Sequence, residues 1–529
     1  MKPSPTYGRI AVLVCSLAPM LVWPFSGHHL AHPSQEGAWA LLCAVLAATT
    51  PARYLHLVLV LQTLTFPLTV GWIGVIAVTG YGPSSAEFEA ATSGSIHEVW
   101  MATQLACTQI AFIVTAIFTF WTLAWAWWAN WRVFQPTSVA IELIYLAAMV
   151  PFGCANMDAA GYPGLATIAG SEVRLSVVWL AHLGMAKSLL AQTIDKVTRG
   201  PTDTKSMRSA LSAEKLFEMS PGLAVFVVGE SLRADALMQK GRGPWSSRLQ
   251  HRFDSGLGVR LRDACAGANS THGSVPLLLT AVEPGDAAAR KATILARAKM
   301  AGAKTAYIIN QGTWIVPETG HDVMQTTTTR EHQSYDDAVI EALGDFVEHT
   351  GYGPKAALLH IYGQHFFYDQ RYPPTAFAPV PENLNADERE ERQYAQAAEY
   401  GLKILLDAAN ILDRQRQPSF LIFTSDHGEN LVSDRTGKKY HALPISGKND
   451  TTVPAIALWN QAFADSGRAR LLNALIEGDG LIAHRDVALA WLSLAGAPGN
   501  VIATPEPKTW GALVAGAGAS AISCSALAP

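Results

Sequence analysis

The sequence predicts a chain in two parts, a helical membrane domain followed by an α/β domain whose sheet is mostly parallel and covered by helices on both faces. Residues 1–190 of the 529-residue chain are very apolar, rich in Trp and almost free of charge. The remainder alternates short apolar runs with helical patterns, an order typical of a parallel sheet between two helical layers. A net charge of −4 provides no basic surface, so we expect no nucleic-acid partner.

Five apolar runs in the first part have the character of transmembrane helices. They are residues 8–25, 37–50, 55–79, 104–128 and 138–152. Basic residues precede the first run and stand between the second and third and between the fourth and fifth, whereas loops 26–36 and 80–103 contain no Lys or Arg. This alternation is the positive-inside pattern for a cytoplasmic amino terminus. Five spans then export everything after residue 152.

A further apolar run, 174–192, contains His182 and Lys187 and is followed by more basic residues. Counted as a sixth span, it would keep the second part in the cytoplasm. Its polar residues favour an amphipathic helix on the membrane surface. The predicted divisions are a membrane domain, a bridging helix with a linker, a soluble α/β domain and a poorly ordered tail: 1–155, 156–218, 219–505 and 506–529.

Two apolar runs in the second part are followed closely by carboxylate or imidazole side chains. Residues 224–228 predict a buried strand followed by Gly229 and Glu230, and the run from Ser419 predicts a strand ending at Asp426 and His427. Ligands of open α/β sheets bind at the carboxyl ends of the strands, so these side chains suggest a metal site. Further strands are predicted at 305–309 and 356–361, and helices at 286–301, 335–348 and 386–412.

The segment 269–276, NSTHGSVP, places hydroxyl residues before a helix predicted to start at Pro276. Such a hydroxyl faces the amide donors of a helix amino terminus, which bind anions. A Thr or Ser bound to a metal loses its proton more easily and becomes a nucleophile. A simple helix cap is the alternative, and the spacing does not separate the two.

Five motifs, taken in order, resemble those of the phosphoethanolamine transferases of the alkaline phosphatase superfamily, the group with lipid A modifying and mobile colistin-resistance enzymes. They are GES at 229–231, Thr-x-x-Ser-Val-Pro at 271–276, GQH at 363–365, SDHGE at 425–429 and His-x-x-Pro at 441–444. The resemblance covers nearly the whole chain. It implies five spans in a bacterial inner membrane, a bridging helix and a periplasmic domain of alkaline phosphatase type.

The resemblance also implies roles for particular residues. Glu230, Asp426 and His427 match zinc ligands, and Thr271 matches the nucleophile that coordinates the same ion. His365 and His441 match histidines that face the substrate phosphate and can hold a second zinc beside the one tightly bound ion. We expect Asn310 and Gln311, which follow a strand, to contact substrate. We expect the same of Glu98 in loop 80–103, although the sequence fits a solvated connector there equally well.

The implied reaction has two displacements. Thr271 attacks the phosphorus of phosphatidylethanolamine and diacylglycerol departs, after which an acceptor on lipid A or another envelope glycan takes the phosphoethanolamine. His365 or His441 supplies acid and base. Anchoring in the membrane suits an enzyme whose donor is a lipid. We expect the protein to be a monomer.

Departures from the family pattern leave the acceptor open among lipid A, a periplasmic glucan and another glycan. His365-Phe366-Phe367 stands where the family often has His-Gly-Pro, and the apolar run 277–279 replaces the usual cysteine partner of Cys265. The second part holds only Cys265 and Cys524, so at most one internal disulfide forms there.

Three alternatives remain. Lipoteichoic acid synthases, which transfer glycerol phosphate and typically use manganese, have a similar layout, but the His365 and His441 motifs favour the ethanolamine group. Sulfatase activity is disfavoured because neither Cys-x-Pro-x-Arg nor Ser-x-Pro-x-Arg stands near Thr271. A non-catalytic lipid-binding relative would have to explain why all four metal-site residues are present.

Overall fold

The computed structural model describes most of the chain from residue 217 onward and a few short stretches before it. The described ranges are 113–117, 119–121, 165–168, 171–174, 217–237, 243–284, 292–311, 320–328, 334–434, 440–441, 446–498, 502–510 and 521–527, with a few single residues. The five predicted spans, Glu98 and nearly all of run 174–192 lie outside these residues, apart from short pieces. Among the residues that are described, no helix is long and apolar enough to cross a membrane.

The chain divides into two compact units. The first comprises residues 1–201 with 516–518, and the second comprises 202–515 with 519–529. In the first unit, β1 (Leu165–Ile168) and β2 (Ser171–Arg174) pair as an antiparallel hairpin. This hairpin lies in the segment for which a bridging helix and linker are predicted.

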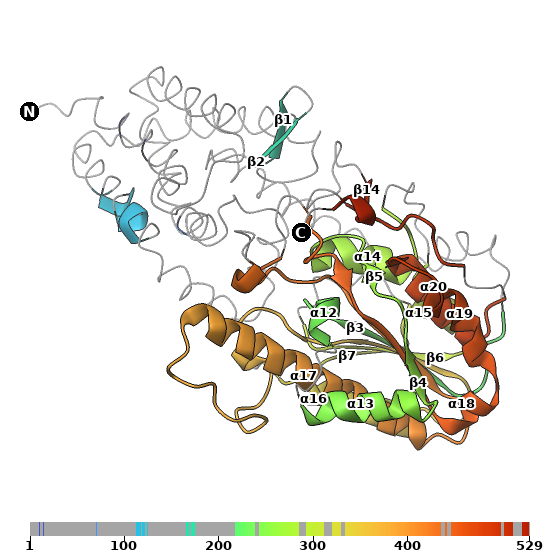
Figure 1. The fold of residues 1–529 in the computed structure, drawn as a ribbon. Helices are drawn as coiled ribbons and strands as arrows, with labels where there is room; N and C mark the ends of the chain where they lie inside the picture. Colours follow the sequence, from blue (N-terminus) through green and yellow to red (C-terminus); the bar gives the residue numbers. More distant parts are fainter. Residues whose placement is uncertain are drawn as a thin grey trace, which may run out of the picture. The chain divides into compact units, whose positions relative to one another are not determined.

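A seven-stranded sheet forms the centre of the second unit, in the order β4-β11-β9-β3-β8-β6-β7 (Figure 1). The strands are β3 (Leu223–Gly229), β4 (Gly258–Arg260), β6 (Lys304–Ile309), β7 (Val323–Thr326), β8 (Lys355–His360), β9 (Phe420–Ser425) and β11 (Ala455–Trp459). The run from β9 to β7 is parallel throughout, and β11 is antiparallel to both of its neighbours. The predicted mostly parallel sheet is therefore confirmed, and the four predicted strands correspond to β3, β6, β8 and β9.

Helices cover both faces of this sheet, and the central strand shows why. In β3, Ala224, Phe226 and Val228 join one buried cluster, whereas the residues that alternate with them join the other. The first face carries α14 (Thr271–Thr280), α15 (Ile294–Met300) and α20 (His484–Ala495); the second carries α12 (Ala234–Leu237), α13 (Pro244–Asp254), α16 (Asp337–His349) and α17 (Ala386–Asp413). Burial on both faces explains why these strands are continuously apolar.

The predicted helix boundaries agree for α16 and α17 and differ in two places. The helix predicted to begin at residue 286 begins, within the described residues, only at Ile294, because Thr293 is extended and its side chain caps Ala296 N. The helix predicted to start at Pro276 starts at Thr271 instead. Its first turn closes when Ser274 N donates to the carbonyl of Ser270, and Pro276 lies inside the helix.

Smaller elements complete the second unit. A three-stranded sheet joins β10 (Thr452–Val453), β5 (Ala264–Cys265) and β12 (Ile482–Ala483), and two short helices, α18 (Gln461–Asp465) and α19 (Asn473–Ile476), follow β11. Short 3-10 turns are η5 (Tyr368–Gln370), η6 (Val432–Asp434), η7 (Arg468–Leu472) and η8 (Cys524–Ala526).

Part of the segment expected to be a poorly ordered tail is structured. Strand β13 (Lys508–Trp510) pairs with β14 (Ala521–Ser523), and Cys524 forms a disulfide with Cys265 on β5. The expectation does not hold for these residues, because the disulfide ties the tail to a buried strand. The residues of this segment are mostly small and apolar, and such a composition does not reveal a disulfide link.

We expect Cys524→Ser to lower the free energy of unfolding by about 2–5 kcal/mol, the usual effect of removing a native disulfide. The two cysteines are 259 residues apart in sequence, so the link restricts a long loop of the unfolded chain. Urea denaturation of the purified oxidised protein measures the effect. Reducing agent should bring the wild-type protein down to the stability of the variant; equal stabilities before reduction would show that the link contributes nothing.

Candidate metal centre

The residues predicted to bind metal come together at the carboxyl edge of the central sheet. Glu230 follows β3, and Asp426 and His427 follow β9, whose residue Ser425 pairs in register with Gly229. Thr271 is the first residue of α14. All four side chains are buried, and three of them are fully inaccessible to solvent. Neighbouring parallel strands end at one edge, which is why residues almost 200 positions apart in sequence meet here.

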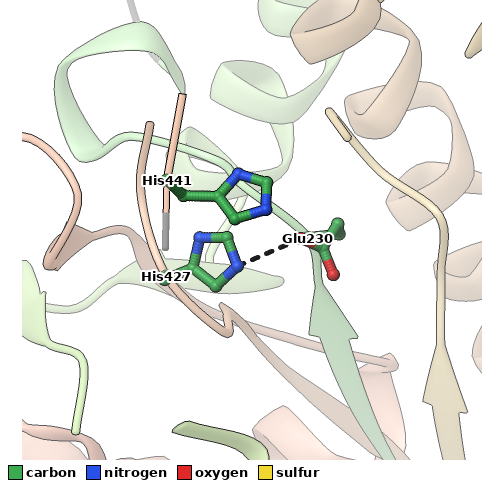
Figure 2. A group of neighbouring side chains, drawn as sticks. All are labelled: Glu230, His427 and His441. Atoms are coloured by element: carbon green, nitrogen blue, oxygen red, sulfur yellow. Dashed lines mark ion pairs between the residues drawn. The ribbon is translucent and has the colours of Figure 1, made fainter. Parts of the chain in front are cut away.

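Their polar atoms surround one point. Thr271 Oγ1 lies 3.1 Å from Glu230 Oε2 and 3.2 Å from His427 Nε2. The same nitrogen lies 3.1 Å from Glu230 Oε1 and 3.3 Å from Asp426 Oδ2. Figure 2 shows the His427 ring directed at the Glu230 carboxylate, with His441 beside both. The structure thus brings the four predicted residues into a single cluster.

Hydrogen bonds orient this cluster for a cation. His427 Nδ1 donates to the carbonyl of Gly428 over 2.8 Å, so Nε2 is the ring nitrogen that faces Glu230 and Thr271 and, once it loses its proton, offers a lone pair to a cation. Asp426 Oδ1 accepts from the amides of Ser231 and His427, whereas Oδ2 is buried with no hydrogen-bond donor among the described residues. A buried, undonated carboxylate oxygen beside an imidazole nitrogen and a hydroxyl fits a metal ion. Three oxygens and one nitrogen suit tetrahedral Zn²⁺.

The electrostatics of the cluster lead to the same conclusion. Burial acts to raise the pKa of Glu230, but the positive charge of His427, with His365 and His441, holds this pKa well below its usual range. Burial and the negative charge of Glu230 raise the pKa of Asp426 well above its usual range. Burial lowers the pKa of His427, but the two carboxylates more than offset it and raise the value to about 10. Two neighbouring buried carboxyl groups are both ionised only with enough positive charge beside them, and a divalent cation would supply more of it than His427 alone.

Gln311, predicted to contact substrate, instead holds a metal-site carboxylate. Its Nε2 donates to Glu230 Oε2 over 2.9 Å and to the carbonyl of Ile361 over 3.0 Å, so both amide hydrogens are used inside the protein. The side chain is 6% exposed. Its position fixes the plane of the Glu230 carboxylate. A partner of this kind commonly sets the affinity of a metal ligand.

Asn310 has every hydrogen-bonding position of its side chain occupied. Its Nδ2 donates to Ser334 O and Asp336 Oδ1, and its Oδ1 accepts from Thr327 Oγ1 and Thr328 Oγ1. The side chain is fully buried. In this arrangement it joins the segments around 327–336 to the end of β6 and offers no position to a substrate.

We expect Gln311→Leu to weaken zinc binding by about 10–100-fold, the usual cost of losing an outer-shell partner of a metal ligand. Competition with a fluorescent zinc chelator measures the dissociation constant. Gln396→Leu is the matched control, because Gln396 is another buried amide whose partners, Tyr372 and Ala378, lie away from the cluster. Unchanged zinc affinity in Gln311→Leu would show that Glu230 needs no such support.

The two motif histidines lie beside the cluster. The His441 ring is 4.3 Å from the His427 ring and 5.5 Å from the His365 ring. His441 Nδ1 lies 3.2 Å from Glu429 Oε2, and the Glu429 side chain is fully buried. This buried carboxylate orients the His441 ring. His441 also has a ligand atom within 4.8 Å of those of Glu230 and His427.

Sequence reasoning missed two residues of the site. His360, the last residue of β8, is buried, and its ligand atom lies within 4.8 Å of those of Glu230 and Asp426. Burial lowers its pKa to about 4, so it is neutral. It ends a predicted strand that pairs with β3, and this position at the sheet edge was the available signal. The other is Glu429, which lies within the SDHGE motif but was assigned no role.

The segment that contains this cluster matches a known protein family. The model of the Sulfatase family matches residues 223–497, more than half of the chain and the whole of the cluster. No curated protein matches the chain.

Solved structures show similarity over one or both parts of the chain. The integral membrane protein lipooligosaccharide phosphoethanolamine transferase A from Neisseria meningitidis is 15% identical, with 93% of this chain and 98% of that chain covered and a TM-score of 0.57. The C-terminal periplasmic domain of EptC from Escherichia coli, in complex with Zn, is 18% identical over 59% of this chain and 98% of that chain, with a TM-score of 0.49. The corresponding domain of the phosphoethanolamine transferase EptC from Campylobacter jejuni is 20% identical over 54% and 92%, with a TM-score of 0.44.

The likeness to the Neisseria protein shows a shared fold, which in the second unit is an α/β domain with a mixed, mostly parallel sheet. The family model adds what such low identities do not, because it spans the seven strands of the central sheet, α14 and the four clustered residues. By that match, the chain belongs to the Sulfatase family.

Proposed function

We propose that this protein is a zinc-dependent phosphotransferase that moves phosphoethanolamine from phosphatidylethanolamine to lipid A or another envelope glycan. One observation carries the proposal. The hydroxyl of Thr271 lies at the first position of α14 and within 3.2 Å of both Glu230 and His427. A hydroxyl held at a helix amino terminus beside metal-binding groups is placed to attack phosphorus.

The residues that would hold the ion are Glu230, Asp426, His427 and Thr271. A zinc ion there would lower the pKa of the Thr271 hydroxyl and offset charge on the phosphoryl oxygens. The amino terminus of α14 contributes further positive potential to the same phosphoryl group. The undonated Oδ2 of Asp426 supports this assignment, because a buried carboxylate oxygen needs either a donor or a cation.

Before the first displacement, the Thr271 hydroxyl loses its proton to water; its Oγ1 then bonds to phosphorus as the bond to the diacylglycerol oxygen breaks. His441 gives a proton to that departing oxygen, and phosphoethanolamine remains on Thr271. In the second, an acceptor hydroxyl loses its proton to His441 and bonds to phosphorus, and the bond to Thr271 Oγ1 breaks. Glu429 supports this role, since its contact with Nδ1 orients the ring.

Several features support the location. A disulfide between Cys265 and Cys524 is typical of an oxidising compartment such as the periplasm. The predicted spans would anchor the chain in the inner membrane, next to its lipid donor. A sulfate-ester hydrolase is disfavoured, because no Cys-x-Pro-x-Arg or Ser-x-Pro-x-Arg stands near Thr271.

Mass spectrometry of the zinc-loaded protein tests the proposal. The protein is incubated with phosphatidylethanolamine and no acceptor, and the peptide containing Thr271 is analysed. We expect one phosphoethanolamine group on Thr271 and release of diacylglycerol. An adduct of glycerol phosphate from phosphatidylglycerol, with none from phosphatidylethanolamine, would instead establish the lipoteichoic acid synthase type of reaction. Zinc binding with no adduct from either lipid would indicate a non-catalytic relative.

A further inference from the structure

Aromatic rings stand next to the metal cluster. The Phe366 ring lies 4.3 Å from the His365 ring and 6.2 Å from the His441 ring, and the Tyr440 ring lies 5.5 Å from that of Phe366 at an interplanar angle of 42°. Phe366 and Tyr440, which we call the aromatic wall, are both half-buried. Each therefore retains accessible surface one ring away from the histidines of the site.

The backbone at this wall is held in an unfavourable conformation. Phe367 and Tyr440 have φ values of 65° and 61°, and Ser231, which contacts His441, has a φ of 57°. Among the described residues, only one other non-glycine residue, Ala281, has a positive φ. Large side chains rarely adopt this region, and such strain concentrates at binding and catalytic sites. The orientation of the rings is therefore imposed by the surrounding structure.

One acidic side chain, Glu390, lies on the face of α17 that is directed toward the site. Glu390 on α17 is half-buried and stands one helical turn before Tyr394, whose ring is 5.0 Å from that of Tyr368 and whose hydroxyl donates to Ser231 O. Residues four apart share a helix face, so Glu390 is on the side of α17 that faces the site. The face of α17 that carries Tyr394 therefore also carries a carboxylate.

Aromatic faces beside a carboxylate bind organic cations. We propose that Phe366, Tyr440 and Glu390 form a subsite for the ammonium of the transferred group; the identification of that group rests on the proposed function. In phosphoethanolamine, one oxygen and two carbons separate the phosphorus from the nitrogen. The His441 ring lies 4.3 Å from the His427 ring and 6.2 Å from the Phe366 ring, so the cluster and the aromatic wall both adjoin this one ring. Glycerol phosphate has no cation to place there.

Calorimetry of the zinc-loaded, full-length protein with two soluble probes tests the subsite. We expect the wild-type protein to bind phosphoethanolamine about tenfold more tightly than glycerol phosphate, an effect of the size that cation–aromatic and charge pairing provide. Glu390→Gln and Phe366→Leu should each reduce this preference to about twofold or less. Both should leave the affinity for glycerol phosphate unchanged, which shows that the phosphate site is intact. Glu391→Gln, an exposed carboxylate one position along α17, is the matched control and should keep the full preference.

Three results would overturn the subsite: equal binding of the two probes by the wild-type protein, a preference that persists in both variants, or equal losses for both probes. The donor experiment separates this inference from the proposed function. A phosphoethanolamine adduct on Thr271 with an unaltered preference in the variants removes the subsite and keeps the transferase. A preference that depends on Glu390 and Phe366, with no adduct on Thr271, keeps the subsite and removes the transferase.

Discussion

Thr271→Ala is expected to abolish phosphoethanolamine transfer, with a loss on the order of 10⁴-fold or more, as removal of a catalytic nucleophile generally gives. The variant lacks the only atom of this residue that can bond to phosphorus. The fold should survive, because alanine is a good helix residue and the hydroxyl makes its contacts with side chains of the cluster, Glu230 and His427 among them. Release of diacylglycerol measures the first displacement, and thermal denaturation measures stability.

The matched control is Thr280→Ala, at the other end of α14, where the hydroxyl bonds to the carbonyl of Pro276 and not to the cluster. It should keep full transfer activity. Thr271→Ser should retain a measurable rate and acquire the adduct on serine. Diacylglycerol release at the wild-type rate by Thr271→Ala would refute the nucleophile and require direct transfer to the acceptor.

Glu230→Gln is expected to weaken zinc binding by more than about 100-fold, beyond the range for outer-shell partners, because it removes a direct ligand charge. The glutamine has nearly the same size and keeps an oxygen, so the change tests charge rather than packing. Because Glu230 is fully buried, a side chain from the protein surface cannot take over its role as a zinc ligand. Elemental analysis after dialysis measures the zinc retained.

Glu399→Gln provides the control for loss of a buried carboxylate. Its Oε1 accepts from the amides of Trp245 and Ser246 at the start of α13, away from the cluster. This variant should lose stability but retain zinc. Stoichiometric zinc in Glu230→Gln at low free metal would exclude Glu230 from the ligand set.

Sequence pattern was sufficient for the sheet and for the four clustered residues, for a physical reason. Burial on both faces makes a central strand continuously apolar, and parallel strands end at one edge, so residues that follow β3 and β9 must meet. Glu230, Asp426 and His427 are predictable in this way because each directly follows its strand. The spacing around Thr271 left a nucleophile and a helix cap open, and only the family resemblance pointed to the nucleophile; its helix starts five residues earlier than predicted, with Pro276 inside it.

Tertiary structure alone decided which side chains support the cluster and which segments are joined. Gln311 and Asn310 follow the same strand, yet one donates to Glu230 and the other binds loop residues. Cys265 pairs with a cysteine 259 residues away, which ties down part of the predicted disordered tail. The sequence determined where each strand carries its polar end, because periodicity and apolar content are local. Partners across loops depend on distances set only when the sheet and its two helical layers have packed, so only the folded structure reveals them.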